Sequence, residues 1–382
     1  MQTNRYNWQH PKWPHFQYDV MVLQECLYQY ALEAGVVMGS LSQLSTLFQT
    51  DAFIDHMVLE ALHTSEIEGE LLDPQALRSS IQRELGIVTN TTIIRDPKVL
   101  GISKLMVLAR ETFAEPLSKE QLFEWHVLLL SDPFVWGRIE IGTWRSGHEP
   151  MQIVSADGWG RDKVHFEAPP AARVDQEMER FIEWFNATDP NNQTGIKIAA
   201  PLRAAIAHLY FESIHPFADS NGRIGRILSE KVLSQALGRP VLLSLSTSIA
   251  KNKKDYYQAL SLASRYEIDI TPWIHYFINV LYQAQLEAKT QITFIVQKTK
   301  FWVHYEHRLN DRQKKVVARL FKAVITGFKG GLSAQKYMKI SECSKATATR
   351  DLGDLVDQGC IVKLEEGGRN TRYTLVLDQA SI

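Results

Sequence analysis

Apolar residues recur at the spacing of an α-helix through most of this chain of 382 residues. Between residues 51 and 63, two apolar rows each step by four positions: Phe53, Met57 and Ala61, and Ile54, Val58 and Leu62. Residues four apart share a helix face, so the rows form one apolar stripe. Similar patterns over 118–131, 172–186 and 197–213 predict a mainly α-helical fold. Ser118 and Gln121 predict a capping box at the first of these.

One stretch breaks the helical pattern. Residues 142–170 hold four glycines and three prolines, and 145–167 reads as a strand, an Asp-Gly turn and a second strand. This arrangement predicts a β-hairpin flap. Such a flap can pair its main chain with an extended peptide, and an ordinary surface hairpin is the alternative.

Composition narrows the class of protein. Lys and Arg number 42 against 43 Asp and Glu, so a uniformly basic nucleic-acid binder is excluded. The three cysteines include no CxxC pair, which excludes a disulfide framework or a cysteine zinc site. The N-terminus lacks a secretory signal, and the longest uncharged run, 34–50, is too polar to span a bilayer. We therefore expect a cytoplasmic protein with no membrane partner.

Charge is distributed unevenly along the chain. Residues 308–376 carry 14 Lys and Arg against 7 Asp and Glu, so a basic C-terminal module follows an acidic body. The expected boundary lies at 290–310. We expect an N-terminal helical region over 1–115, a central core over 116–290 and a C-terminal module over 300–382.

The run from His215 to Arg226 lies between two helical patterns. Pro216 ends the first helix, and a second begins near Gly222, so its free N–H groups point into the connecting loop. Arg223 and Arg226 share a helix face and suit phosphate.

Two further residues of this run favour phosphoryl transfer. Asp219 is a hard oxygen ligand suited to Mg²⁺ on phosphates, and His215 can take a proton near pH 7. A base, a metal carboxylate, a helix start and two arginines are the parts of such a site. An isolated His-Pro or Asn-Gly-Arg would indicate only an ordinary helix boundary, whereas the twelve-residue combination favours the site.

This run resembles the signature of Fic-domain proteins, HPFx(D/E)GNGRxxR, and the resemblance covers about residues 50–290. The matching residues are His215, Pro216, Phe217, Asp219, Asn221, Gly222, Arg223 and Arg226. The resemblance implies a nucleotidyltransferase that moves AMP from ATP to a Ser, Thr or Tyr hydroxyl of a protein. His215 would be the catalytic base, and Asp219 would hold Mg²⁺. Nucleotide would contact the loop and helix start, namely Asp219, Ser220, Asn221, Gly222, Arg223, Gly225 and Arg226.

Ser220 departs from the family, which has Gly at this position. A left-handed backbone there costs Ser about 1 kcal/mol, so weakened nucleotide binding is an open alternative. The resemblance also implies that Tyr256 and Tyr257 contribute to an adenine pocket. Packing of both rings in the core is the alternative, and His208 is expected to pack as well.

Residues 64–69 fit a second family pattern, [ST]xxxE[GN]. Thr64 and Glu68 are four apart on one helix face, and Gly69 would end the helix. The resemblance implies that Glu68 pairs with Arg226 and so inhibits the site. A solvated acidic helix end is the alternative, because Glu66 and Glu70 lie nearby.

The C-terminal module looks like a winged helix-turn-helix. Helices are expected over 311–328, 333–340 and 345–358, and strands over 359–363 and 371–375. The DNA-binding residues would be Lys345, Thr347, Thr349 and Arg350 in the major groove, with Arg369 and Arg372 of the wing on phosphates. A protein-binding or spacer role is the alternative.

Together these features predict a mainly α fold: a Fic-type helical core with a β-hairpin flap, and a C-terminal winged helix-turn-helix. The leading function is a protein adenylyltransferase that is restrained by Glu68 and uses Mg²⁺ and ATP on an unknown target protein, including itself. The alternatives are a nucleotide-sensing DNA-binding regulator, and Fic-type phosphate transfer or AMP removal. The oligomeric state stays open, with a homodimer as one option.

Overall fold

The computed structural model describes residues 5–87, 94–132, 137, 139–156, 162–193, 195–326, 331–364 and 371–377. Contacts divide the chain into two compact units, Met1–Lys289 and Thr290–Ile382. The expected division at residue 115 falls inside the first unit and stays a prediction. No described helix combines the length and the apolar character that crossing a bilayer requires.

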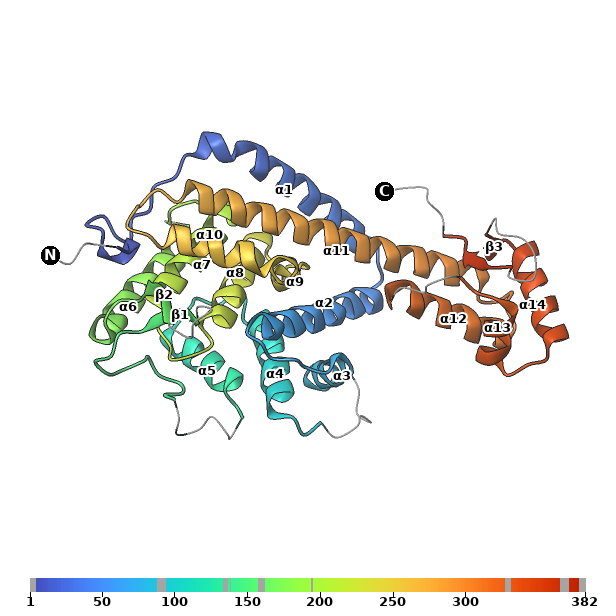
Figure 1. Ribbon diagram of the computed structural model, residues 1–382. Helices are drawn as coiled ribbons and strands as arrows, with labels where there is room; N and C mark the ends of the chain where they lie inside the picture. The colour runs from blue at the N-terminus through green and yellow to red at the C-terminus, as the bar shows by residue number, and fades with distance from the viewer. Residues whose placement is uncertain are drawn as a thin grey trace. The chain divides into compact units, whose positions relative to one another are not determined.

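Helices build the first unit, as the periodicity predicts (Figure 1). They are η1 (Asn7–Gln9), α1 (Val20–Ser42), α2 (Thr46–Ile67), α3 (Pro74–Glu84), α4 (Pro97–Glu111), α5 (Lys119–Leu129), α6 (Ala171–Ala187), α7 (Ala200–Ile214), α8 (Asn221–Leu237), α9 (Leu245–Lys251) and α10 (Lys253–Ala263). Helix α11 (Thr271–Tyr305) begins in the first unit and continues into the second.

Helix α7 is the centre of the first unit. Every residue from Pro201 to Ile214 is buried, and the helix packs most extensively against α8. A helix that is covered on all faces belongs in a core rather than at a surface. Arg203 is buried with it and donates to Phe185 O, Thr188 Oγ1 and Gln235 Oε1. Helix α7 therefore gives the α7–α8 loop a buried and rigid support.

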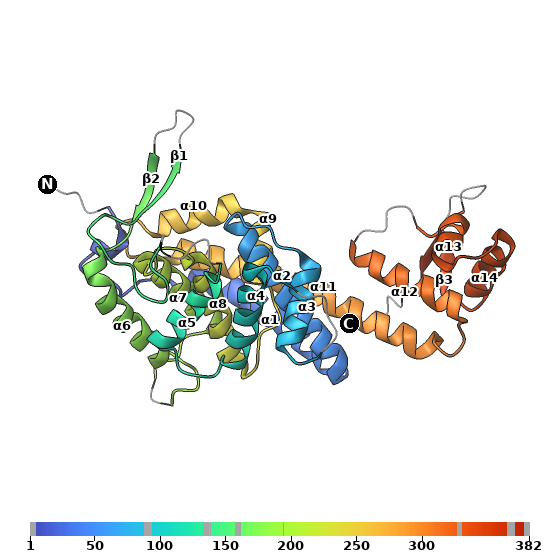
Figure 2. The same cartoon turned by 90° about the horizontal axis from the view of Figure 1, so that it is seen from below.

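The predicted flap is a two-stranded antiparallel hairpin of β1 (Gln152–Ala156) and β2 (Asp162–Glu167). The hairpin projects from the helical body (Figure 2). The pairing register of its two strands shifts between Ile153 and Val154. The expected Asp-Gly turn lies outside the described residues.

The capping box predicted at α5 is half formed. Ser118 Oγ accepts the Gln121 N–H at 3.1 Å. The Gln121 side chain, however, donates to Thr112 Oγ1 at 3.2 Å rather than returning to Ser118. Gln121 Oε1, the atom that would accept the Ser118 N–H in a capping box, has no hydrogen-bond partner among the described residues. The prediction of a reciprocal pair was wrong, because the amide group turns toward Thr112 instead.

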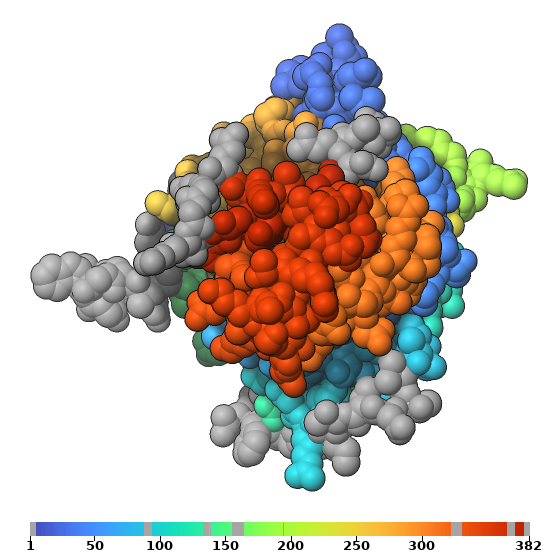
Figure 3. Space-filling view, turned by 90° about the vertical axis from the view of Figure 1, so that its right-hand side faces the viewer, coloured from blue at the N-terminus to red at the C-terminus, as the bar shows by residue number. Residues whose placement is uncertain are grey.

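The second unit has its own core, which includes Val316, Phe321 and Leu352. Its elements are α12 (Asp311–Thr326), α13 (Ala334–Ser341), α14 (Lys345–Asp357) and the antiparallel strands β3 (Ile361–Lys363) and β4 (Tyr373–Leu375). Figure 3 shows the surface of these helices in orange and red. The expected elements are present, with strands shorter than predicted, and their identity as a winged helix stays a prediction. Arg369 lies outside the described residues.

Candidate active site

The loop between α7 and α8 is held in a defined conformation. His215 ends α7 with a left-handed backbone, φ 50°, and Ser220 precedes α8 at φ 68°. The Asn221 side chain accepts the Phe217 N–H at 3.0 Å and donates to Phe217 O at 2.9 Å. These bonds close the loop, so the first N–H groups of α8 are available to an anion.

Ser220 adopts the left-handed conformation that the family pattern fills with Gly. Its Oγ accepts from Arg223 Nη2 at 2.9 Å, and its N–H donates to Asp219 Oδ1. The loop therefore tolerates Ser, at a backbone cost of about 1 kcal/mol. The hydroxyl also engages an arginine that was predicted to bind phosphate.

Arg226 is fully buried and bound to the end of α2. Its Nη2 lies 2.8 Å from Glu68 Oε1, and its Nε donates to Thr64 Oγ1 at 2.8 Å. Gly222 makes this approach possible, because a Cβ there would lie 2.5 Å from Glu68 Oε1. Helix α2 ends at Ile67, and Gly69 follows with φ 84°. The residues that the two motifs predicted are thus in contact.

The neighbouring arginine has its own carboxylate. Arg223 Nη1 donates to Glu70 Oε2 at 2.9 Å, and Lys98 Nζ donates to the other oxygen of Glu70 at 2.8 Å. The sequence analysis missed Glu70, which it counted with a solvated helix end. The available signal was its position two residues after Glu68, across a glycine that reverses the chain.

Both members of the Glu68–Arg226 pair are held in their charged forms. Burial raises the pKa of Glu68, but the charge and hydrogen bond of Arg226 outweigh burial, so its pKa is lowered. Burial likewise lowers the pKa of Arg226, and Glu68 reverses the effect, so its pKa is raised. The pair therefore persists as an ion pair at neutral pH.

The His215 ring is 14% exposed and neutral at pH 7. Burial, and then the charge of Arg145, lower the pKa of the imidazole to about 4. Arg145 also fixes the end of α7, because its Nε donates to His215 O at 2.7 Å and its N–H to Pro216 O at 2.9 Å. Arg145 was missed because it comes from the glycine-rich stretch, 70 residues earlier. A neutral imidazole is the form that can accept a proton.

A cavity of about 750 Å³ lies between the flap and α10, and it reaches the last turn of α7 at Glu212. Flap residues such as Val154 and Phe166, α10 residues such as Tyr257, and Glu212 line it. Tyr256 instead lies in the core, where its hydroxyl is 2.8 Å from His208 Nε2. The structure therefore places Tyr257 at the cavity wall and Tyr256 in the packing role that the sequence left open.

Gly225 faces α7, where a Cβ would lie 2.8 Å from Glu212 Oε1. The geometry thus gives Gly225 a packing role, and its contact with nucleotide stays a prediction. Asp219 is 57% exposed, with Oδ1 3.8 Å from Arg223 Nη2. The described residues contain no cluster of three His, Cys, Asp or Glu side chains suited to a metal. One accessible carboxylate fits Mg²⁺ that arrives with phosphates and water as its other ligands.

The candidate DNA-binding residues lie on α14 in the second unit. Lys345, Thr349 and Arg350 are exposed, and Thr347 is half-buried. The hydroxyls of Thr347 and Ser344 form a hydrogen bond of 3.0 Å, in which either oxygen can be the donor. Thr349 Oγ1 donates to Lys345 O at 2.9 Å. The two basic side chains are therefore presented to solvent from one helix.

The fold and the site define a helical protein in which a closed loop joins α7 to the free N–H groups at the start of α8. Two family profiles match the chain: the Fic/DOC family over residues 116–233, and "Domain of unknown function (DUF4172)" over residues 6–87. The chain therefore carries a domain of the Fic/DOC family.

Curated relatives support the same assignment. "Protein adenylyltransferase Fic" of Nematostella vectensis is 26% identical over 231 residues, 59% of this chain and 46% of the relative. "Protein adenylyltransferase fic-1" of Caenorhabditis elegans is 25% identical over 226 residues, 57% of this chain and 38% of the relative. The chain spans less than half the length of these relatives.

Solved structures share the fold. A Fic family protein from Desulfovibrio desulfuricans superposes with a TM-score of 0.51 at 21% identity, covering 93% of this chain and 97% of that chain. Fic-1 from C. elegans gives 0.51 at 20% identity, covering 74% of each chain. The predicted Fic-type helical fold is confirmed.

Proposed function

We propose that this chain transfers AMP from ATP to a hydroxyl group of a protein, and that Glu68 restrains the transfer. The Glu68–Arg226 ion pair carries the proposal, because it joins the two motifs through a 2.8 Å contact. The names of the relatives, a neutral His215 and an open helix start support the same activity.

The reaction needs a base and a site for phosphate. His215 Nδ1 faces Glu212, so Nε2 is the nitrogen left to take the proton of the target hydroxyl. The target oxygen then bonds to the α-phosphorus, the bond from that phosphorus to the bridging oxygen breaks, and pyrophosphate leaves. The α8 N–H groups would stabilise charge on the phosphate oxygens. Mg²⁺ held by Asp219 would supply further charge neutralisation.

Restraint follows from competition for one guanidinium group. A γ-phosphate and the Glu68 carboxylate require the same donors of Arg226. In the structure these donors bind Glu68 and Thr64, and Glu70 occupies Arg223. A triphosphate must therefore displace two carboxylates, or bind in a position that leaves its α-phosphorus out of line.

Intact-mass spectrometry after incubation with ATP and Mg²⁺ tests this proposal. We expect Glu68→Gly to gain AMP faster than the unmodified sequence, and Glu68→Gly with His215→Ala to gain none. Glu66→Gly is the matched control, because Glu66 is half-exposed and pairs with His63. Equal labelling with and without Glu68 would refute the restraint. A gain of phosphate in place of AMP would assign the alternative Fic chemistry.

A further inference from the structure

Glu212 is a buried carboxyl group next to the proposed base. It lies on α7, one turn before His215, and is 6% exposed. Its Oε2 is 3.8 Å from His215 Nδ1. Among the described residues, neither His215 Nδ1 nor Glu212 Oε1 has a hydrogen-bond partner that meets standard geometry. Buried polar atoms without partners are uncommon in proteins, and they concentrate at functional sites.

The neighbouring helix is shaped around this carboxyl group. Gly225 of α8 leaves room for Glu212 Oε1, because any Cβ there would lie within 2.8 Å of it. Glu212 also lines the 750 Å³ cavity between the flap and α10. The carboxyl group is thus both sterically fixed and adjacent to the proposed base.

We propose that Glu212 is a positioning residue for the proposed reaction, orienting the His215 imidazole through Nδ1 and stabilising the imidazolium that forms when Nε2 takes the target proton. The inference rests on the proposed function. A carboxylate that accepts an Nδ1–H fixes the tautomer with Nε2 free. The proton balance is complete, because the hydroxyl proton moves to Nε2 and Glu212 gains none.

Electrostatics support the pairing. Burial raises the pKa of Glu212 to about 8 and lowers that of His215 to about 4, so either charge alone is unfavourable in this space. Arg226 from α8 favours the Glu212 carboxylate, and Glu68 after α2 disfavours it. The charge of Glu212 also raises the pKa of Tyr256 on α10, while Arg145 and the Glu212 carbonyl face His215. An imidazolium beside a carboxylate relieves both burial costs at once.

The test compares Glu68→Gly with Glu68→Gly/Glu212→Gln, measuring AMP transfer and ¹⁵N NMR signals of the His215 ring between pH 5 and 9. His215→Gln identifies the signals. We expect Glu212→Gln to slow transfer roughly 10- to 100-fold with little change in the KM for ATP. In Glu68→Gly, we expect the rate of AMP transfer to rise and the ¹⁵N signals of the ring to shift near pH 8. Both changes should disappear in Glu68→Gly/Glu212→Gln. Glu212→Asp should retain the pH response at a reduced rate.

Glu177→Gln is the matched control, since Glu177 is a buried acid on α6 that accepts from Trp13 Nε1 at 2.9 Å. An unchanged rate and an unchanged His215 titration in Glu212→Gln would overturn the inference. If Glu68→Gly transfers no AMP at all, the proposed function fails. The NMR titration then still decides whether Glu212 controls the imidazole.

Discussion

At the scale of single residues, Ser220 combines a strained backbone with a side-chain contact. Ser220 takes a left-handed backbone and binds Arg223 through its hydroxyl. The hydroxyl therefore competes with phosphate for a guanidinium group that the proposed reaction needs.

Replacing Ser220 with Gly in the Glu68→Gly background should tighten ATP binding. Glycine adopts the same backbone without strain, and Arg223 loses one competing partner. Loss of a single hydrogen bond predicts a roughly 2- to 10-fold lower Kd for ATP, measured by calorimetry. A weaker or unchanged affinity would show that the hydroxyl does not compete.

Glu70 makes a separate prediction, because it occupies Arg223 rather than Arg226. Glu70→Gln should raise the rate of AMP transfer, by less than Glu68→Gly does, and the double variant should exceed both. Initial rates with labelled ATP measure this. Lys98→Met is the control, since it removes the other partner of Glu70 and leaves the Arg223 pair intact. A double variant no faster than Glu68→Gly would contradict a second restraint.

The sequence predicted the loop because its residues form one short local pattern, and the family resemblance implied the pairing of Arg226 with Glu68. It did not predict Arg145 or Glu70, and it gave Glu212 no role. Each of these acts through contacts across a turn or between distant segments. Such contacts leave no periodic or spacing signal in a single chain.

At the scale of elements, α2 and α8 meet along a row of polar side chains. His56, Glu60, Thr64 and Glu68 are spaced by four along the α2 segment. On α8, Arg226 binds Thr64 and Glu68, and Glu230 Oε1 lies 3.7 Å from His56 Nε2. Periodicity predicted α2 as an amphipathic helix from its apolar rows, but not this second, polar face.

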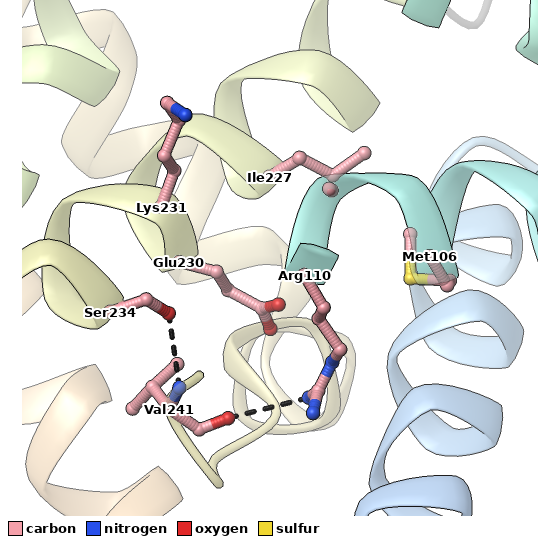
Figure 4. Close-up of a pocket in the computed structure, with 8 residues that line it drawn as sticks. Met106, Arg110, Ile227, Glu230, Lys231, Ser234 and Val241 are labelled. Carbon is pink, nitrogen blue, oxygen red and sulfur yellow. Dashed lines mark hydrogen bonds between the residues drawn. The ribbon is translucent and has the colours of Figure 1, made fainter. Parts of the chain in front are cut away.

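Buried carboxyl groups lie at the far end of this row. Glu60 accepts from Ser244 Oγ at 2.7 Å. Glu230 and Arg110 line one small pocket, in which Arg110 Nη2 donates to Val241 O at 3.3 Å (Figure 4). Burial, and then the neighbouring Glu230, raise the pKa of Glu60 to about 7. Burial also raises the pKa of Glu230 to about 7, against the charge of Arg110.

These raised pKa values predict that the fold loses stability as the pH rises from 4.5 to about 7. The unfolded chain releases both protons near the ordinary value of 4.5, whereas the folded chain holds them to about pH 7. The resulting stability is complete below pH 4.5 and is lost as the pH rises through 7. Urea unfolding should show a loss on the order of 1–3 kcal/mol from these groups. Glu230→Gln should flatten this slope, and an equally steep slope would contradict the assignment.

At the scale of the whole molecule, the two compact units meet in the chain at Lys289 and Thr290. The change from an acidic to a basic composition predicted a boundary at 290–310. The net charge of a segment can be counted from the sequence alone, so the boundary can be predicted without a structure. Within this basic segment, exposed Lys345 and Arg350 give α14 a surface that an anionic partner can contact.

We propose DNA as the partner of the second unit, and salt dependence tests it. The full chain should bind duplex DNA at low salt, with an affinity that falls as salt rises, because phosphate contacts release counterions. Arg350→Ala should weaken binding and reduce the salt slope, whereas Lys104→Ala, an exposed change on α4, should not. Absence of binding at low salt, measured by fluorescence anisotropy, would refute this partner.

The central claim is that the α7–α8 loop holds a triphosphate beside a histidine base. A crystal structure of Glu68→Gly with Mg²⁺ and a non-hydrolysable ATP analogue tests it most directly. We predict phosphates on the α8 N–H groups and on Arg223 and Arg226, with His215 Nε2 facing the α-phosphorus. An analogue bound elsewhere, or an imidazole turned away from it, would contradict the account.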